Sequence, residues 1–375
     1  MPPRQVCLVL SGGIALGAYQ AGAYAALHEH EALHPGYVGG SSIGAIASAL
    51  IAGNPLERRV ERLRDFWSAV AVEREPFGAP WLNLSGEGPW RHAHNWLSVF
   101  QSRAFGSPGA FQPRVPELLL HPVTSLYDLA PLRATLERLI DFDRLNDGGS
   151  PRVSIVTTDI ETGEAVVFDT GRGDRIGPDH LVATCGFLPD FAPVEIEGRL
   201  LGDGGLSANA PMETVLLDPK AGDDLLCFVV DMFSPEGRRP ATLEEAAARR
   251  WDLMFGNQSR QTLRSLEAEF RLRSGLARLA HRLGPKARQD PDIAPVLADA
   301  SERTATLLYL SYRAPRHEAG PEKPFDFSRA TLADRWESGF LDMTEAVRLA
   351  GERGRQASGL SVRKVRRSAR GVARA

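Results

Sequence analysis

A serine between two glycines is the residue of this 375-residue chain best suited to nucleophilic chemistry. The run Gly40-Ser41-Ser42-Ile43-Gly44 follows a short extended stretch, Tyr37-Val38-Gly39, and precedes an apolar helical stretch, 45–51. Glycines on both sides let the backbone adopt the strained strand-to-helix turn that exposes a nucleophilic hydroxyl. The pattern therefore predicts Ser42 as a nucleophile. Because glycine and serine also crowd ordinary turns, this motif on its own fits a plain turn as well.

A glycine-rich loop supplies candidate donors for the oxyanion that a serine nucleophile generates. The loop, Ser11-Gly12-Gly13-Ile14-Ala15-Leu16-Gly17, lies between the first predicted strand and a helix over 17–31. Backbone N–H groups at the positive end of a helix stabilise negative charge, so Gly12, Gly13 and Ile14 are predicted to form an oxyanion hole. A dinucleotide site is not favoured, because the G-x-G-x-x-G spacing is not met and no acid ends the second strand.

The base that would take the serine proton is assigned to Asp203. Gly204 and Gly205 follow it directly and allow the backbone to bring a short carboxylate close to another loop. Histidine is the usual choice, and His180 is the best placed of the nine, but its position at the start of a short helix fits capping or packing. A second Asp-Gly-Gly, at 147–149, lies in a polar connection and predicts a surface turn.

The elements that must position these residues alternate between strand and helix. Such alternation predicts a mainly parallel sheet covered by helices on both faces, that is, a three-layer α/β/α sandwich. In such sheets ligand crevices open at the carboxyl ends of the strands, where Ser42 and the glycine loop would meet. The pattern predicts strands at 6–10, 37–40, 152–158, 165–168, 225–230 and 304–312, helices over 17–31, 43–51, 132–140 and 179–185, and a hairpin at Glu197-Gly198.

The chain is predicted to consist of a catalytic domain, 5–235, and a mostly helical extension, 236–375. An insertion at 66–111 holds four of the six tryptophans and is interpreted equally as a lid over a pocket or as a satellite hydrophobic cluster. Within the extension, the strand near 304–312 is expected to return to the sheet. The basic tail, 361–375, could touch anionic lipid or RNA, although such tails are more often solvated termini.

Composition excludes several classes of protein. A net charge of -3 gives no reason to expect nucleic-acid binding, and three widely spaced cysteines predict buried free thiols rather than a metal site or disulfides. No apolar segment approaches the length of a membrane span, and the first apolar run is too short for a signal peptide. We expect no metal and no cofactor, and a cytoplasmic location, with peripheral contact at a membrane surface as an alternative; oligomeric state is not predicted.

Taken in order, three motifs of this chain resemble the patatin family of lipid acyl hydrolases. They are the glycine loop 11–17, the elbow 40–44 and the segment Asp203-Gly204-Gly205-Leu206-Ser207-Ala208-Asn209-Ala210-Pro211, and the stretch 183–189 is similar as well. The resemblance covers about residues 5–235. Its supporting glycines are Gly17, Gly40, Gly44, Gly204 and Gly205. The stretch 15–22 looks like a bacterial branch of the family, some members of which are linked to hydroxyalkanoate polyesters.

The resemblance implies a serine acyl-ester hydrolase with a Ser–Asp dyad and no histidine or cofactor. Ser42 would be the nucleophile and Asp203 the proton acceptor, acting on a phospholipid, glyceride or polyester. Many family members carry a third glycine where Ile14 stands, so its side chain is expected to point away from the site. Many also carry a basic residue where Leu16 stands, which makes recognition of a phosphate less secure than ester hydrolysis.

Other functions fit the same sequence. The altered glycine loop, the additional helices and the basic tail also fit a catalytically silent lipid-binding or scaffold protein on this fold. Hydrolysis of hydroxyalkanoate polyesters, thioesters or amides at the same dyad is a further alternative. Turnover of an ester substrate separates the first alternative from an enzyme.

Overall fold

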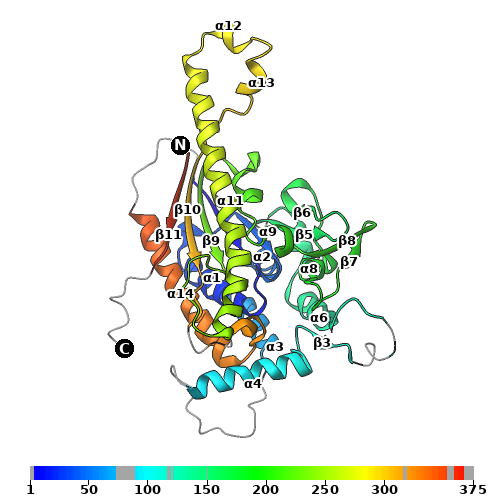
Figure 1. Ribbon diagram of the computed structural model, residues 1–375. Helices are drawn as coiled ribbons and strands as arrows, with labels where there is room; N and C mark the ends of the chain where they lie inside the picture. The colour runs from blue at the N-terminus through cyan, green and yellow to red at the C-terminus, as the bar shows by residue number, and fades with distance from the viewer. Residues whose placement is uncertain are drawn as a thin grey trace.

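The computed structural model describes residues 4–72, 89–115, 120, 122–149, 151–315, 318, 320–352 and 359–366 of the chain. The centre of the molecule is a sheet of nine strands in the described residues, ordered β11-β10-β9-β1-β2-β5-β8-β7, with β6 paired to β5 (Figure 1). The strands are β1 Gln5–Leu10, β2 Tyr37–Ser41, β5 Arg152–Asp159, β6 Ala165–Asp169, β7 Val194–Ile196, β8 Arg199–Asp203, β9 Asp224–Asp231, β10 Thr304–Ser311 and β11 Gly359–Lys364.

The sheet is mainly parallel, as the sequence predicted. All pairings from β11 across to β5 are parallel, whereas β6, β7 and β8 join by antiparallel pairing. The predicted turn at Glu197-Gly198 connects β7 to β8, and both residues have the positive φ that a tight hairpin turn requires. The turn over 161–164 connects β5 to β6.

Helices cover both faces of the sheet, which confirms the three-layer fold class. Along β1 the side chains of Leu8 and Leu10 enter one core cluster, while those of Cys7 and Val9 enter another on the opposite face. The first face carries α1 (Ala18–His28), α2 (Ile43–Ala52), α3 (Arg59–Val70) and α14 (Arg329–Gly351), and the second carries α10 (Met212–Leu216) and α11 (Leu243–Arg282).

Helices α1 and α14 are in very close contact. A Cβ atom added at Gly22 would lie 1.9 Å from the Trp336 carbonyl oxygen, and one added at Gly339 would lie 1.9 Å from the Tyr19 carbonyl oxygen. Only glycine fits at these two positions. This contact attaches the end of the chain to its beginning.

The remaining helices and strands lie around the sheet at both ends of its strands. They are α4 (Pro89–Phe105), β3 (Gln112–Pro113), β4 (Tyr127–Asp128), α6 (Ala130–Leu139), α7 (Phe142–Asn146), α8 (Pro178–Ala183), α9 (Gly205–Ala208), α12 (Pro285–Arg288) and α13 (Ala294–Leu297). Within the predicted insertion 66–111, the described residues belong mainly to the end of α3 and to α4, and residues 73–88 lie outside the described part.

The C-terminal part of the chain belongs to the same sheet. The strand predicted near 304–312 is β10, which pairs with β9. The charged stretch from 242 to about 285, which the pattern indicates as helical, forms α11, and its buried residues, among them Phe255, Leu263 and Leu266, contribute to the cores. The division of the chain after residue 235 stays a prediction.

The interpretation of 361–375 as a solvated terminus is wrong for its first part. Residues 361–364 belong to β11, which pairs in parallel with β10, and Lys364 and Arg366 bind the carboxylate of Glu236 at 2.6 and 3.0 Å. Leu360 and Val362 alternate with polar residues, so they pack on the sheet while the charges face outward. Residues 367–375 lie outside the described part.

Three further findings concern groups that the composition singled out. Cys7, Cys185 and Cys227 are buried free thiols, as predicted. Among the described helices none is both long and apolar enough to cross a membrane. The described residues contain no cluster of three or more histidine, cysteine or acidic side chains that could hold a metal ion.

Candidate active site

Ser42 lies on a strained turn between β2 and α2. Its φ of 53° and ψ of −127° are unusual for a residue with a side chain, and they place it at the N-cap of α2. The Thr184 hydroxyl accepts a hydrogen bond from the Ser42 N–H at 2.9 Å and itself donates to the Val156 carbonyl. The turn is therefore held from a neighbouring segment as well as by its own glycines.

The two elbow glycines are required because the backbone is so crowded here. A Cβ atom at Gly40 would lie 2.4 Å from the Gly44 carbonyl group, and one at Gly44 would lie 2.2 Å from the Leu10 carbonyl oxygen. Strand β1, strand β2 and helix α2 can approach this closely only without those side chains. The backbone here has the strand, tight turn and helix that the sequence predicted for this motif.

Asp203 is the last residue of β8, where the antiparallel pairing with Thr157 of β5 ends. The Gly205 N–H donates to its Oδ1 at 2.6 Å, and Ser42 lines the same cavity and lowers the pKa of the carboxyl group. A Cβ atom at Gly204 would lie 2.1 Å from the Val156 carbonyl oxygen, so glycine is needed for this approach as well. The structure thus brings together the two residues that the sequence paired as nucleophile and base.

Burial dominates the electrostatics of Asp203. The residue is 4% exposed, and burial raises the pKa of its carboxyl to about 7, while the Ser42 hydroxyl and the hydrogen bond from Gly205 act in the opposite direction. A carboxyl with a pKa near neutrality is well matched to transferring a proton at physiological pH. Burial and the Asp203 charge raise the pKa of the neighbouring Cys185 thiol well above its usual value, so this sulfur is protonated and poorly nucleophilic.

The three residues proposed as oxyanion donors are not equivalent. The Gly12 N–H donates to the Asn209 carbonyl at 3.1 Å, so this group is already engaged. Gly13 precedes, and Ile14 begins, a 3₁₀ turn over Ile14–Gly17, where N–H groups have no partner within the turn. In the described part of the chain no acceptor engages these two N–H groups. Gly13 and Ile14 therefore remain available as donors, and Gly12 anchors the loop.

The glycine loop is fastened to its surroundings by buried polar groups. The Ser11 N–H donates to the Val230 carbonyl at 3.1 Å, and the Met232 N–H donates to the Ser11 hydroxyl at 2.9 Å. The Gln20 side chain donates to the Ser11 carbonyl at 2.6 Å. Leu16 is fully buried and Gly17 packs against Ile43, so the loop offers no cation to a ligand at either position.

Gln258 on helix α11 holds the Asp203 segment from outside the three motifs. Its Oε1 accepts a hydrogen bond from the Asn209 N–H at 2.7 Å, and its Nε2 donates to the carbonyls of Ser207 at 3.2 Å and Gly205 at 3.4 Å. Sequence reasoning missed Gln258, because it lies on a charged helix 55 positions after Asp203 with no motif around it. Thr184 was also missed, although it belongs to the stretch 183–189 that the sequence singled out.

Ser42 and Asp203 line one apolar cavity of about 50 Å³. Its wall comes mainly from aromatic and aliphatic side chains, including Phe66, Trp67, Phe111, Phe187, Phe191 and Phe327. Ile14 lines it too, which differs from the expectation that this residue points away from the site. An isoleucine is compatible here because the cavity itself is apolar. Trp67 and Phe111 belong to the aromatic insertion, so part of that insertion does line a pocket.

The other candidates lie elsewhere. His180 accepts a hydrogen bond from the Gly177 N–H at 3.1 Å and packs edge-on against Phe168, so it caps α8, as expected. The Asp147 carboxylate accepts from the Gly149 N–H in an exposed turn, the surface turn that was predicted. No histidine lines the Ser42 cavity in the described structure.

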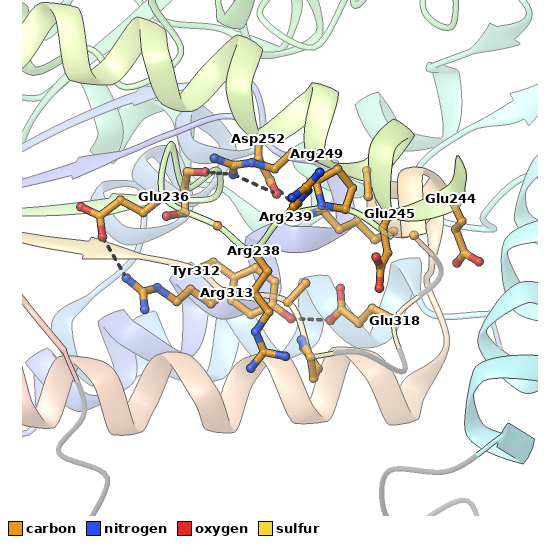
Figure 2. Close-up of a pocket in the computed structure, with 18 of the residues that line it drawn as sticks. Glu236, Arg238, Arg239, Glu244, Glu245, Arg249, Asp252, Tyr312, Arg313 and Glu318 are labelled. Atoms are coloured by element: carbon orange, nitrogen blue, oxygen red, sulfur yellow. Dashed lines mark hydrogen bonds and ion pairs between the residues drawn. The ribbon is translucent and has the colours of Figure 1, made fainter. Parts of the chain in front are cut away.

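A second hollow at the carboxyl edge of the sheet is larger and highly charged. This charged groove has a volume of about 1610 Å³ and lies between the segment after β9, the start of α11 and the segment after β10 (Figure 2). Figure 2 shows acidic and basic side chains along both of its walls, with Glu318 bonded to Tyr312. Arg238 and Arg239 also line the groove. It contains neither Ser42 nor Asp203.

The fold and the Ser42 cavity together define a three-layer α/β protein with a serine on a strained strand-to-helix turn at the wall of an apolar cavity. A family model described as "Patatin-like phospholipase" matches residues 8–216, more than half of the chain, and the chain belongs to this family. A second family model, described as "Patatin phospholipase", matches residues 253–358. A comparison with curated proteins gives no match.

Solved structures of three proteins are similar over most of this chain. VipD from Legionella pneumophila has 14% sequence identity and a TM-score of 0.39, with 93% of this chain and 67% of VipD covered. Human GIVD cytosolic phospholipase A2 has 14% identity and a TM-score of 0.38, covering 93% and 60%. ExoU, in its complex with SpcU from the type III secretion system of Pseudomonas aeruginosa, has 18% identity and a TM-score of 0.28, covering 78% and 59%.

Proposed function

We propose that this protein hydrolyses carboxylic esters of lipids with Ser42 as nucleophile and Asp203 as general base. One observation carries the proposal: Ser42 on its strained turn and the buried carboxyl of Asp203, whose pKa burial raises and the Ser42 hydroxyl lowers, line the same apolar cavity. Membership of the patatin-like phospholipase family supports a lipid ester as the substrate class. A purely structural serine and aspartate would need neither the backbone strain nor the burial.

In the proposed reaction, ionised Asp203 accepts the Ser42 proton as Oγ attacks the ester carbonyl carbon. The N–H groups of Gly13 and Ile14 donate to the carbonyl oxygen as it becomes negative. The bond to the alcohol then breaks, the alcohol receives the proton from Asp203, and the acyl group stays on Ser42. A water molecule that loses its proton to Asp203 attacks this acyl-enzyme, the carboxylic acid leaves, and Ser42 regains its hydrogen.

The apolar cavity is the proposed site of the acyl chain. At about 50 Å³ it holds no more than one or two water-sized groups, each about 30 Å³ in the liquid. An acyl chain therefore requires its aromatic wall to move apart. Leu16 leaves the glycine loop without a cation, so we place selectivity in the acyl chain rather than in a phosphate bound at that loop.

Covalent labelling tests the proposal. A fluorophosphonate probe, followed by peptide mapping, should modify Ser42 in the wild-type protein and leave Asp203→Asn unlabelled. A folded wild-type protein that stays unlabelled and turns over no ester would overturn the hydrolase proposal in favour of a silent lipid-binding protein. Parallel assays with phosphatidylcholine, a triglyceride, a hydroxyalkanoate oligomer and an acyl thioester then rank the substrate classes.

A further inference from the structure

Helix α4, Pro89–Phe105, turns its polar side toward the protein. Arg91, Asn95, Ser98 and Ser102 recur every three or four residues and so share one face, and all four are buried, at 5%, 0%, 3% and 0% exposed. A helix on the surface of a water-soluble protein normally buries its apolar face instead. Helix α4 therefore buries a row of polar side chains, together with Val99, on its inner side.

The opposite side of α4 is an apolar stripe that faces outward. Its members recur at the same helical spacing and include Trp90, which is 70% exposed, and Phe100, which is 63% exposed; Phe105 at the end of the helix is 71% exposed. We define the α4 stripe as Trp90, Ala93, Leu97, Phe100 and Ala104, together with Phe105. Leu97 and Ala104 are half-buried and the other four members are exposed. Isolated exposed apolar residues are ordinary, but several on one helical stripe indicate a surface that contacts something apolar.

Ion pairs hold the helix in this orientation. The Arg91 guanidinium donates to Asp334 at 2.7 Å and to Asn95 at 3.1 Å, and that of Arg103 donates to Glu322 at 3.0 Å and to Asp190. Rotating α4 to bury its stripe would leave the buried Arg91 charge without its partner, which is strongly unfavourable. The outward position of the stripe is thus fixed by the packing of the rest of the molecule.

The stripe lies close to the Ser42 cavity. On the inner side of α4, Val99 and Trp96 pack into the same core as Phe111, whose ring lines the cavity. The Arg103 guanidinium lies 3.4 Å from the centre of the Phe325 ring, and Phe325 stacks on Phe191 of the cavity wall. Figure 1 shows α4 at one end of the molecule, opposite α12.

The charged groove adjoins the first turn of α4. His92 lines this groove and lies 3.6 Å from Glu244 at the start of α11. Among the residues that the structure describes, neither Arg238 nor Arg239 has a hydrogen-bond or ion-pair partner (Figure 2). The apolar stripe of α4 and these two guanidinium groups of the adjoining groove match the two layers of a phospholipid surface, the acyl boundary and the phosphates.

We propose that the α4 stripe is a membrane-docking surface that seats the protein on a phospholipid bilayer, with Arg238 and Arg239 meeting the headgroup phosphates. For its consequence in catalysis this inference rests on the proposed function, because docking would deliver lipid to the wall of the Ser42 cavity. A bilayer fits better than a second copy of the chain. A symmetric dimer through this surface would bring the same unpaired arginines of both copies toward one interface.

Vesicle co-sedimentation tests the surface without turnover. The full chain carrying Ser42→Ala should bind vesicles of mixed phosphatidylcholine and phosphatidylglycerol. Adding Phe100→Glu should weaken binding about 10- to 100-fold, the cost of no longer burying one phenylalanine side chain. The matched control is Leu272→Glu on α11, which is 61% exposed and lies roughly 40 Å along the helix from its start, and this change should leave binding intact.

The contribution of charge is tested separately. Replacing both Arg238 and Arg239 by serine should weaken binding to phosphatidylglycerol vesicles roughly 10-fold or more, at about 1 kcal/mol for each arginine near an anionic surface. Binding to pure phosphatidylcholine should change much less. Equal loss on both vesicles would overturn the assignment of these arginines to phosphates.

Three results would overturn the docking proposal. They are unchanged vesicle binding by Phe100→Glu, equal loss in Leu272→Glu, or a wild-type dimer in analytical ultracentrifugation that Phe100→Glu dissociates. Hydrolysis of a water-soluble short-chain ester distinguishes failure of the docking proposal from failure of the hydrolase proposal, because this substrate needs no membrane. With Ser42 present, Phe100→Glu should hydrolyse this ester at the wild-type rate while losing activity on vesicles. Vesicle binding through α4 without any ester turnover would leave the docking surface standing and remove the hydrolase function.

Discussion

Two buried carboxyl groups at the carboxyl edge of the sheet have pKa values that are shifted in opposite directions. Asp203 in the Ser42 cavity and Glu318 beside the charged groove are both 4% exposed. Burial raises the pKa of Asp203 to about 7, whereas the pKa of Glu318 is held below its usual value. The Arg335 guanidinium makes the difference, because it donates to both oxygens of Glu318 at 3.1 and 3.0 Å.

The comparison shows that burial alone does not decide what a carboxyl group does. Around Glu318, Arg335 and the Tyr312 hydroxyl compensate the lost hydration, and the group ties the segment after β10 to α14. Asp203 has a hydrogen bond from Gly205 and the Ser42 hydroxyl nearby but no ion pair within the described residues, so its charged form remains costly. Because no cation pairs with Asp203 in the described residues, its pKa stays near 7, and its ionised form is basic enough to accept a proton.

The largest effect should follow from removing either member of the dyad. Ser42→Ala and Asp203→Asn should each lower kcat/KM for a soluble ester by on the order of 10⁴-fold or more, because nucleophile and base act as one unit. Cys185→Ala is the matched control in the same cavity and should keep most of the activity, since its thiol is protonated. If Cys185→Ala were inactive while Ser42→Ala stayed active, Ser42 would not be the nucleophile.

Breaking the ion pair between Arg335 and Glu318 should lower stability rather than activity. Arg335→Met leaves Glu318 buried without its cation and should lower the free energy of unfolding by about 3–5 kcal/mol, measured by urea denaturation. The double variant Arg335→Met with Glu318→Gln should recover much of this loss. Equal destabilisation of the single and double variants would show that Arg335 contributes by packing and not by pairing.

The pH dependence of Asp203 has a definite sign for both rate and stability. The base must be ionised, so kcat/KM should rise with pH through an apparent pKa of about 7 and fall tenfold per unit below it. The folded protein binds this proton more tightly than the unfolded chain, so the stability contributed by Asp203 is lost as pH rises from about 4 toward 7. Thermal unfolding of Asp203→Asn should lack that decline, and an identical decline in wild type and variant would assign it to other groups.

The smallest expected effect concerns the helix that supports the catalytic segment. Gln258→Ala removes three hydrogen bonds to the backbone after Asp203 and should lower kcat roughly tenfold, with KM little changed, because the carboxylate is then less well positioned. Gln258→Glu keeps the acceptor for the Asn209 N–H but loses the two donors, so its kcat should lie between those of the wild type and Gln258→Ala. A change in unfolding free energy with no change in kcat would make Gln258 purely structural.

Much of the fold was predictable because its signals are local. Strand, glycine turn and helix follow one another within a few residues at the loop 11–17 and at the elbow 40–44, and the hairpin turns carry their own glycines. The wrong interpretation of 361–366 arose because its many basic residues outweighed the alternation of Leu360 and Val362. A strand with basic residues at a sheet edge is stabilised by its neighbour, which the sequence does not show.

The amino-acid sequence by itself determined the three motifs and the α/β class, because each depends on residue type and short spacing. The pairing of Ser42 with Asp203 was implied by the resemblance that the ordered motifs carry. Only the tertiary structure decided which loop N–H groups are free, that Gln258 holds the Asp203 segment, and that α4 faces outward with its apolar side. These properties depend on contacts between residues far apart in the chain. Such contacts are set by how the two faces of the sheet are packed, and no local pattern specifies them.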